Sequence, residues 1–92
     1  MKQTIDEVLS ERGARYGTFA GQAEISQHLK RVVRGYLDKR GKSLADDQME
    51  AVEMVIHKLA RAINGDADFI DHWVDMAGYS QLVADRLQGV VR

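Results

Sequence analysis

The sequence predicts an all-α protein of about four helices, with the long helices packed as an antiparallel bundle. Proline is absent, and apolar residues recur every three or four positions over long stretches, as they do on the buried face of a helix. The 92 residues make one domain, expected to span residues 1–92. Because a chain this short buries only a modest part of its surface, we also expect a homo-oligomer.

Composition argues against several functional classes. The net charge is −1, so the chain lacks the overall basic field of most nucleic-acid-binding proteins, and DNA is not an expected partner. There is no cysteine, which excludes disulfides and fits the cytoplasm. The start of the chain does not resemble a secretory signal, and no apolar run approaches the roughly 20 residues that span a bilayer. We therefore expect a cytoplasmic protein without a membrane segment.

Residues 1–18 are predicted to form a short helix and a turn. Thr4 can cap this helix, and Gly13 is expected to end or fray it. In the turn, Gly17 permits a left-handed backbone conformation, and Thr18 can cap the helix that follows.

Residues 19–41 are predicted to form the second helix. Gly41 stands where a glycine commonly terminates a helix. The expected core face consists of the apolar residues at three- and four-residue spacing, which are Ile25, Leu29, Val32, Val33, Tyr36 and Leu37.

Residues 43–88 are predicted to form a helical hairpin. Ser43 can cap its first helix, expected over residues 44–63. Asn64-Gly65 is a strong stop signal, and the second helix is expected over residues 67–88. The expected buried stripe of the first helix is Val52, Val55, Ile56, Leu59, Ala62 and Ile63.

The second helix of the hairpin carries its own apolar stripe, which is Phe69, Trp73, Met76, Ser80, Val83 and Leu87. Trp73 is therefore expected in the core, and its neighbour His72 at the surface or in an interface. Gly78 in mid-helix costs about 1 kcal/mol relative to alanine. We expect it to permit the close approach of a neighbouring helix or a ligand.

Four carboxylates on the hairpin are candidate magnesium ligands: Glu50, Glu53, Asp71 and Asp75. Touching helices lie about 8–10 Å apart, so suitable helix rotations would aim all four into one cleft. Hard cations prefer such oxygen ligands, and a metal held there can bridge substrate phosphates. In a simpler interpretation, the two glutamates lie on an exposed face while Arg61–Asp71 and Lys58–Asp75 form ion pairs between the helices.

Five further residues are candidate ligand contacts. Lys58 and Arg61 can neutralise phosphate charge, and Arg15 can hold a phosphate while Tyr16 stacks on a base. His57 can serve as a base or as a phosphate donor. The structural alternatives are that Tyr16 anchors the turn to the core and that His57 belongs to an interface.

The chain from Glu11 onward resembles a group of small uncharacterised phage and prophage proteins. This resemblance covers nearly the whole chain and implies a phage or prophage origin. The matching segments are Glu11-Arg12-Gly13-Ala14-Arg15-Tyr16-Gly17, Lys58-Leu59-Ala60-Arg61, Asn64-Gly65-Asp66 and Asp75-Met76-Ala77-Gly78-Tyr79.

The hairpin is also similar to the MazG-like all-α nucleoside triphosphate pyrophosphohydrolases, which bind magnesium through Glu-x-x-Glu and Glu-x-x-Asp. Glu50 and Glu53 match the first motif, and Asp75 matches the aspartate of the second. The chain departs from the second motif because Asp71 lies four residues before Asp75 and His72 occupies the position three before it. The resemblance implies magnesium-dependent hydrolysis between the α and β phosphates.

Together these features predict a small phage or prophage protein that binds a nucleotide or related phosphate compound. If catalytic, it would be a magnesium-dependent nucleoside triphosphate pyrophosphohydrolase. The alternatives are a non-enzymatic protein that binds a host protein, and a sponge that sequesters a nucleotide signal. For a phage-encoded protein, the expected location is the host cytoplasm.

Overall fold

The computed structural model describes residues 2–92, which form four helices and no strand. None of the described helices is both long enough and apolar enough to cross a membrane. The prediction of an all-α protein with four helices is confirmed. The helices are α1 (Ile5–Tyr16), α2 (Phe19–Lys39), α3 (Asp46–Asn64) and α4 (Ile70–Leu87).

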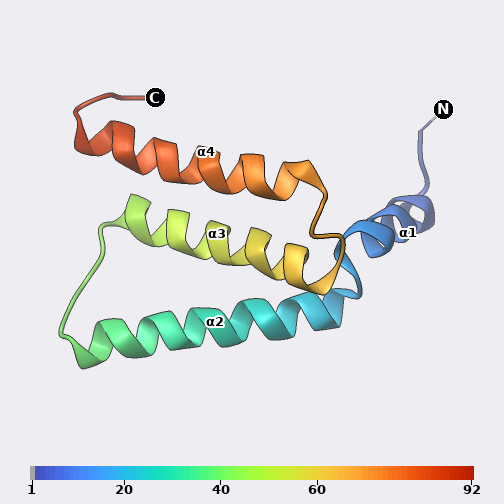
Figure 1. Cartoon of the computed structure of the whole chain (residues 1–92), viewed down its shortest axis with the longest axis horizontal. Helices are drawn as coiled ribbons and strands as arrows, with labels where there is room; N and C mark the ends of the chain where they lie inside the picture. The colour runs from blue at the N-terminus through green and yellow to red at the C-terminus, as the bar shows by residue number, and fades with distance from the viewer. Residues whose placement is uncertain (1) are drawn as a thin grey trace.

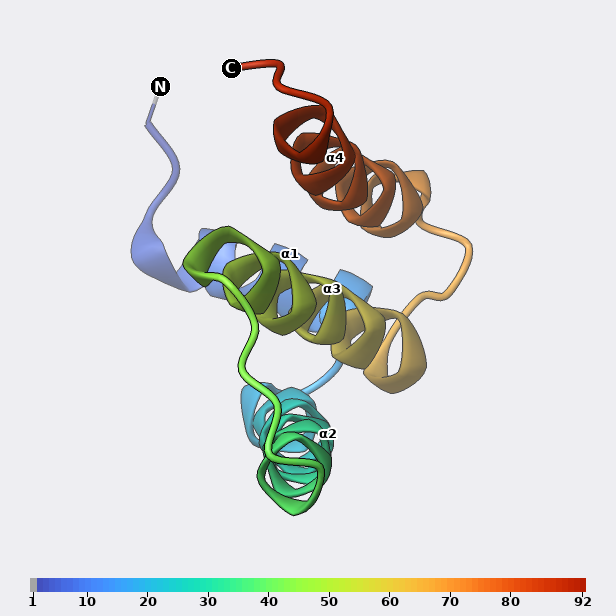
Figure 2. The ribbon, with the colours of Figure 1, turned by 90° about the vertical axis from the view of Figure 1, so that its left-hand side faces the viewer.

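The three long helices form a single layer with α3 in the middle (Figure 1). Helix α3 packs against α2 on one edge and α4 on the other, and within residues 2–92 α2 and α4 do not pack on each other. Helix α1 lies beyond the end of the layer where α2 begins and α3 ends (Figure 1), and its first turns extend to one side of the layer (Figure 2). We call that side of the layer the α1 side and the opposite side the open side.

Two predicted caps are present at the start of the chain. The Thr4 hydroxyl accepts the backbone N–H of Glu7, and the Thr18 hydroxyl accepts that of Gly21, each at 3.1 Å. The prediction that Gly13 ends or frays α1 is wrong. The helix continues to Tyr16 and ends at Gly17, whose φ of 75° suits glycine.

The end of α2 follows the predicted pattern. Gly41 has a φ of 59° and donates its N–H to the Asp38 carbonyl at 3.1 Å. The N–H of Lys42 reaches the Leu37 carbonyl at 2.9 Å. These two bonds satisfy carbonyls that the last turn would otherwise leave unpaired.

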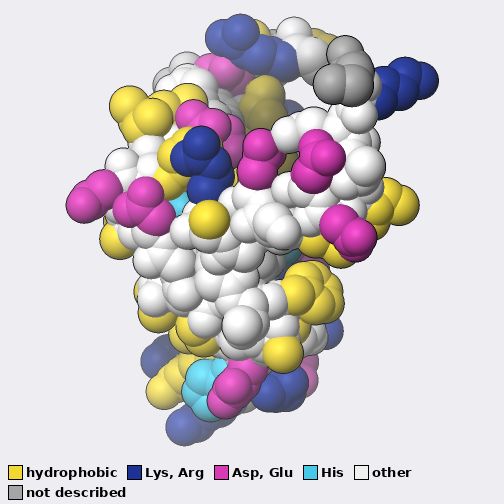
Figure 3. Space-filling model, turned by 90° about the vertical axis from the view of Figure 1, so that its right-hand side faces the viewer, with side chains coloured by type: hydrophobic (Ala, Val, Ile, Leu, Met, Phe, Trp, Pro, Cys, Tyr) yellow, Lys and Arg dark blue, Asp and Glu magenta, His cyan; other side chains and the backbone are white. Residues whose placement is uncertain are grey.

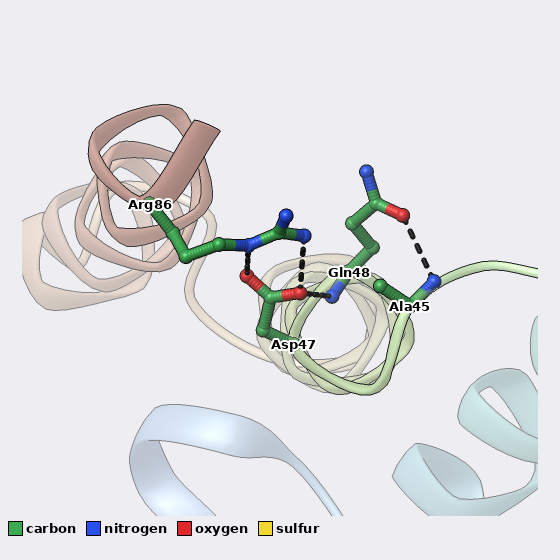
Figure 4. A network of polar contacts seen from close by, with 4 residues as sticks. All are labelled: Ala45, Asp47, Gln48 and Arg86. Atoms are coloured by element: carbon green, nitrogen blue, oxygen red, sulfur yellow. Dashed lines mark hydrogen bonds and ion pairs between the residues drawn. The ribbon is translucent and has the colours of Figure 1, made fainter. Parts of the chain in front are cut away.

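The start of α3 differs from the prediction that Ser43 caps it. The N-cap residue is Ala45, whose N–H donates to the side-chain oxygen of Gln48 at 2.9 Å. Helix α3 therefore begins at Asp46, and Asp47 in its first turn accepts two hydrogen bonds from Arg86, at 2.6 and 2.7 Å (Figure 4). This two-bond ion pair ties the start of α3 to the end of α4.

Asn64, the last residue of α3, links distant parts of the chain. Its side-chain amide donates to the carbonyls of Tyr16 and Thr18, both at 2.8 Å. A Cβ atom at Gly17 would overlap the Asn64 carbonyl, so glycine allows the two backbones to approach this closely. The predicted stop at Asn64-Gly65 is confirmed, and it is also the point where the α1–α2 turn is fastened to α3.

Among the described residues, four polar or charged side chains are buried but only three apolar ones. The buried apolar residues are Ile56, Ala60 and Ala62, and the buried polar or charged residues are Gln22, Ser26, His72 and Asp85. The predicted core positions Ile56 and Ala62 are confirmed, whereas Ile63 of the same predicted stripe is 60% exposed.

The prediction that Trp73 lies in the core is wrong in the described chain, and His72 lies in a contact between helices rather than at the surface. His72 is only 2% exposed and Trp73 is 51% exposed. Helix α4 is rotated so that Asp75 and Arg86 pair with α3. His72 lies on the same face as Asp75 because three residues make nearly one turn, and Trp73 is turned about 100° away.

We expect Asn64→Ala to lower the free energy of unfolding by about 2–3 kcal/mol, because two carbonyls at the α1–α2 turn lose their donor. Thermal unfolding at fixed protein concentration would measure the change. Gln27→Ala removes an exposed amide from α2 and should change stability by less than about 0.5 kcal/mol. Equal effects of the two substitutions would show that the Asn64 bonds contribute nothing specific.

Candidate functional site

Five side chains form a contiguous cluster where α1, α3 and α4 meet, and we call it the cation–aromatic cluster. The guanidinium of Arg61 lies 4.1 Å from the centre of the Tyr16 ring, and that of Arg15 lies 4.3 Å from the centre of the Phe69 ring. The His72 ring contacts both aromatic rings, with centroids 5.6 Å from Tyr16 and 5.2 Å from Phe69. Cations stacked on aromatic faces in this way are attracted by the ring quadrupole.

The local structure explains why these residues meet. Arg15 and Tyr16 occupy the last turn of α1, and Arg61 lies one turn before the end of α3. The N–H of Asp66 donates to the Arg15 carbonyl at 2.7 Å. A Cβ atom at Gly65 would overlap the backbone of Arg15 and Tyr16, so glycine is required at this approach.

The structure thus brings together three of the predicted ligand contacts, Arg15, Tyr16 and Arg61. Tyr16 is half-buried in the position predicted for a residue that anchors the turn. Within residues 2–92, two buried nitrogen atoms of the cluster have no hydrogen-bond partner: Nε of Arg61 and Nε2 of His72. The cluster therefore has unused hydrogen-bonding capacity.

His57 experiences a positive field on the α1 side. Burial lowers the pKa of its imidazole below 6.5, and the charges of Arg61, Lys30 and Lys58 lower it further. Lys58 pairs with Asp75 at 2.8 Å. In residues 2–92, Arg61 and Lys30 form no ion pair, and neither does Arg15. The local excess of positive charge suits a bound anion.

The four predicted magnesium ligands are spread over separate places in the structure. Asp75 is paired with Lys58, and Glu53 is 3.3 Å from Arg34 of α2. Glu50 and Asp71 are exposed. Among the described residues, no three or more His, Asp or Glu side chains gather as a metal site requires. The magnesium site therefore remains a prediction without geometric support in this chain.

The simpler interpretation of these carboxylates holds for one ion pair. Lys58–Asp75 joins α3 to α4 as expected. The other expected pair, Arg61–Asp71, is not among the ion pairs of residues 2–92, because Arg61 lies over the Tyr16 ring instead.

A shallow groove lies along α4, with a volume of about 510 Å³. Its lining is Val74, Asp75, Gly78, Tyr79 and Leu82. No other part of the described chain lies within 4 Å of a Cβ atom built at Gly78. The prediction that Gly78 admits a neighbouring helix is therefore wrong within this chain, and its role toward a ligand stays a prediction.

Several residues of the site were not among the predicted contacts. Lys30 belongs to a basic series on α2 that is typical of a solvated face, and only packing shows its proximity to His57. Phe69 and His72 lie against Arg15 and Tyr16, which precede them by more than 50 residues in the chain. The pattern Asn64-Gly65-Asp66 is a usable indication of this junction, because the residues that end a helix can also form hydrogen bonds to another segment of the chain.

Comparisons with protein-family models, with curated proteins and with solved structures find no match to this chain. The residues and their geometry are therefore the basis for the functional proposal below.

The ion pair between Lys58 and Asp75 gives a pH-dependent prediction. The hydrogen bond from Lys58, and then its charge, lower the pKa of Asp75 below 3.8. The pair therefore stabilises the folded state at neutral pH, and this contribution is lost as the pH falls below about 4. We expect Asp75→Asn to lower the urea midpoint at pH 7, and we expect this difference from the wild type to shrink as the pH falls below 3.8 toward the lowered pKa of Asp75.

The matched control is Asp71→Asn, which alters an exposed carboxylate one turn away on the same helix. It should leave the urea midpoint at pH 7 nearly unchanged. A wild-type midpoint retained by Asp75→Asn at pH 7 would mean that the ion pair does not stabilise the fold.

Proposed function

We propose that the protein binds a nucleotide or a related phosphate compound on the α1 side of the layer. The observation that carries this proposal is that three cations of this region, Arg15, Lys30 and Arg61, have no carboxylate partner in residues 2–92. Arginine presents planar donors that match phosphate oxygens, so a phosphate is a suitable partner for such a site.

The proposed roles follow from the contacts of each residue. Stacking on Tyr16 holds the guanidinium of Arg61 in one orientation. This side chain therefore loses less conformational entropy when a ligand binds. Lys58 and Lys30 add positive charge near His57. Arg15 and Tyr16 would contact the remainder of the ligand.

Retention of the ligand is favoured over its hydrolysis. A magnesium site built from Glu50, Glu53, Asp71 and Asp75 would require Asp75 to leave Lys58 and Glu53 to leave Arg34. Binding through the unpaired cations requires neither change. The proposed activity is therefore that of a sponge for a nucleotide signal, and magnesium-dependent hydrolysis between the α and β phosphates is the second possibility that the assay below tests.

The proposed setting is the cytoplasm of a cell that carries a phage or prophage. We propose that the protein acts there as a homo-oligomer in which the long helices of each chain form an antiparallel bundle. The order of the α3–α4 ion pairs supports this topology, because Asp47 meets Arg86 while Lys58 meets Asp75. A host protein as partner is the alternative if no phosphate compound binds.

We expect the purified protein to retain at least one member of a panel of canonical and modified nucleoside triphosphates, with and without magnesium. Calorimetry would give the affinity, and mass spectrometry would identify the retained compound. Arg61→Gln should weaken binding about tenfold to a hundredfold, because a charge-assisted hydrogen bond contributes about 1.5–3 kcal/mol.

The matched control is Lys42→Gln, which removes one positive charge from the α2–α3 connection, at the opposite end of α3 from Arg61. It should bind like the wild type. Monophosphate formed only with magnesium and lost in Glu53→Gln would instead establish the hydrolase. If no compound is retained or cleaved, the proposed function is wrong, and a protein partner becomes the better explanation.

His57 provides a spectroscopic test of the same site. A bound phosphate would offset the positive charges that, with burial, lower the pKa of His57, so this pKa should rise on binding. NMR titration of the histidine ring protons with the retained nucleotide would measure the rise. The signals of His28, exposed on α2, serve as the internal control. An unchanged His57 titration would place the ligand elsewhere.

A further inference from the structure

The single chain is too extended for a compact monomer of its size. Its accessible surface is 6868 Å², about 1,500 Å² more than the roughly 5,350 Å² expected for a compact monomer of its mass, 10.3 kDa. Its radius of gyration is 15.5 Å, against about 12 Å for a compact domain of this length. The flat layer, with α2 and α4 on opposite edges of α3, accounts for the excess (Figure 2).

Much of the excess surface is apolar. Tyr36 is 57% exposed and Leu87 is 61% exposed, although both belong to helix stripes that the sequence pattern assigns to the core. Hydrophobic side chains also reach the surface at the end of the molecule where α1, α2 and the α3–α4 connection meet (Figure 3). Monomeric proteins rarely leave large apolar patches uncovered.

An apolar groove of about 510 Å³ crosses all three long helices. None of the side chains that line it is charged, and only two are polar. The lining is Val33, Leu44, Gln48, Ala51, Val52, Val55, Ile56, Ser80 and Val83.

This groove lies on the open side of the layer. Val52 and Arg61 are nine residues apart on α3, which is two and a half turns, so they point to opposite sides of the helix. Arg61 contacts Tyr16 of α1 and marks the α1 side. The groove is therefore separate from the proposed phosphate site.

We infer that the open side is the interface through which two copies of this chain pack face to face. The excess of about 1,500 Å² per chain falls within what obligate homodimers bury, which is about 1,000–2,500 Å² per partner. A symmetric contact applies the same face to itself, so one contact would cover the uncharged groove and the exposed stripe residues of both copies. A charged peptide or a nucleic acid would find no complementary charge in the groove.

The inference does not depend on ligand binding, because it concerns the opposite side of α3. Light scattering coupled to gel filtration should give a mass of at least twice 10.3 kDa for the wild type at micromolar concentration. Its unfolding temperature should rise with protein concentration, since folding and association are coupled.

Ser80→Arg is the test variant, because Ser80 is exposed in the single chain and lines the groove. It removes no packed side chain, so the helices should still form, and the mass should fall to that of one chain. Val74→Arg places the same charge on α4 outside the groove, at a residue that is 58% exposed, and should keep the wild-type mass.

Because the chain has no cysteine, a nitroxide on Ser80→Cys gives a second readout that needs no disruptive charge. Its collisions with a water-soluble relaxation agent should be several-fold fewer than those of a nitroxide on Val74→Cys. A wild-type monomer with a concentration-independent unfolding temperature would overturn the inference. So would an oligomer that survives Ser80→Arg, or equal accessibility of the two labels.

Discussion

The two hydrogen bonds from the Asn64 amide to the carbonyls of Tyr16 and Thr18 are the interaction on which the arrangement of the four helices depends. Together with the bond from the Asp66 N–H to the Arg15 carbonyl and the stacking of Arg61 on Tyr16, they fix α1 against the end of α3. They also satisfy carbonyls at a chain reversal, where backbone groups lack helical partners. Gly17 and Gly65 are needed at this junction because a side chain at either position would occupy the space of the opposing backbone.

The same junction creates the charge distribution of the candidate site. Fastening α1 to the end of α3 places Tyr16 under the Arg61 guanidinium and Arg15 over Phe69. Meanwhile the carboxylates Asp47 and Asp75 are taken up by ion pairs that align α4 along α3. These two acidic groups take part in ion pairs between α3 and α4, whereas several basic groups stay unpaired within the described chain, which is the reason for proposing an anion rather than a metal cation as the ligand.

Helix α4 also buries polar side chains and exposes apolar ones. His72 and Asp85 of α4 are buried, whereas Trp73 and Leu87 on the same helix are more than half exposed. Asp85 tolerates burial because Gln81 and Arg92 each donate a hydrogen bond to it at 2.7 Å. Helix α4 thus buries two polar side chains while part of its apolar stripe stays exposed, which is consistent with the proposed contact on the open side.

The sequence by itself determined the helical class, the number of helices and most of their ends. These depend on interactions within a few residues, such as the caps at Thr4 and Thr18 and the left-handed glycine at Gly41. Only the tertiary structure decided the rotation of α4, which buries His72 and exposes Trp73, because both residues lie near a predicted core stripe and ion pairs with α3 select the face. The packing of α1 against the end of α3 likewise decided that Arg15, Tyr16 and Arg61 lie close together. The sequence leaves the pairing of Asp75 with Lys58 as one of two interpretations, since spacing along a helix gives the height of a carboxylate but not the direction in which a partner helix lies.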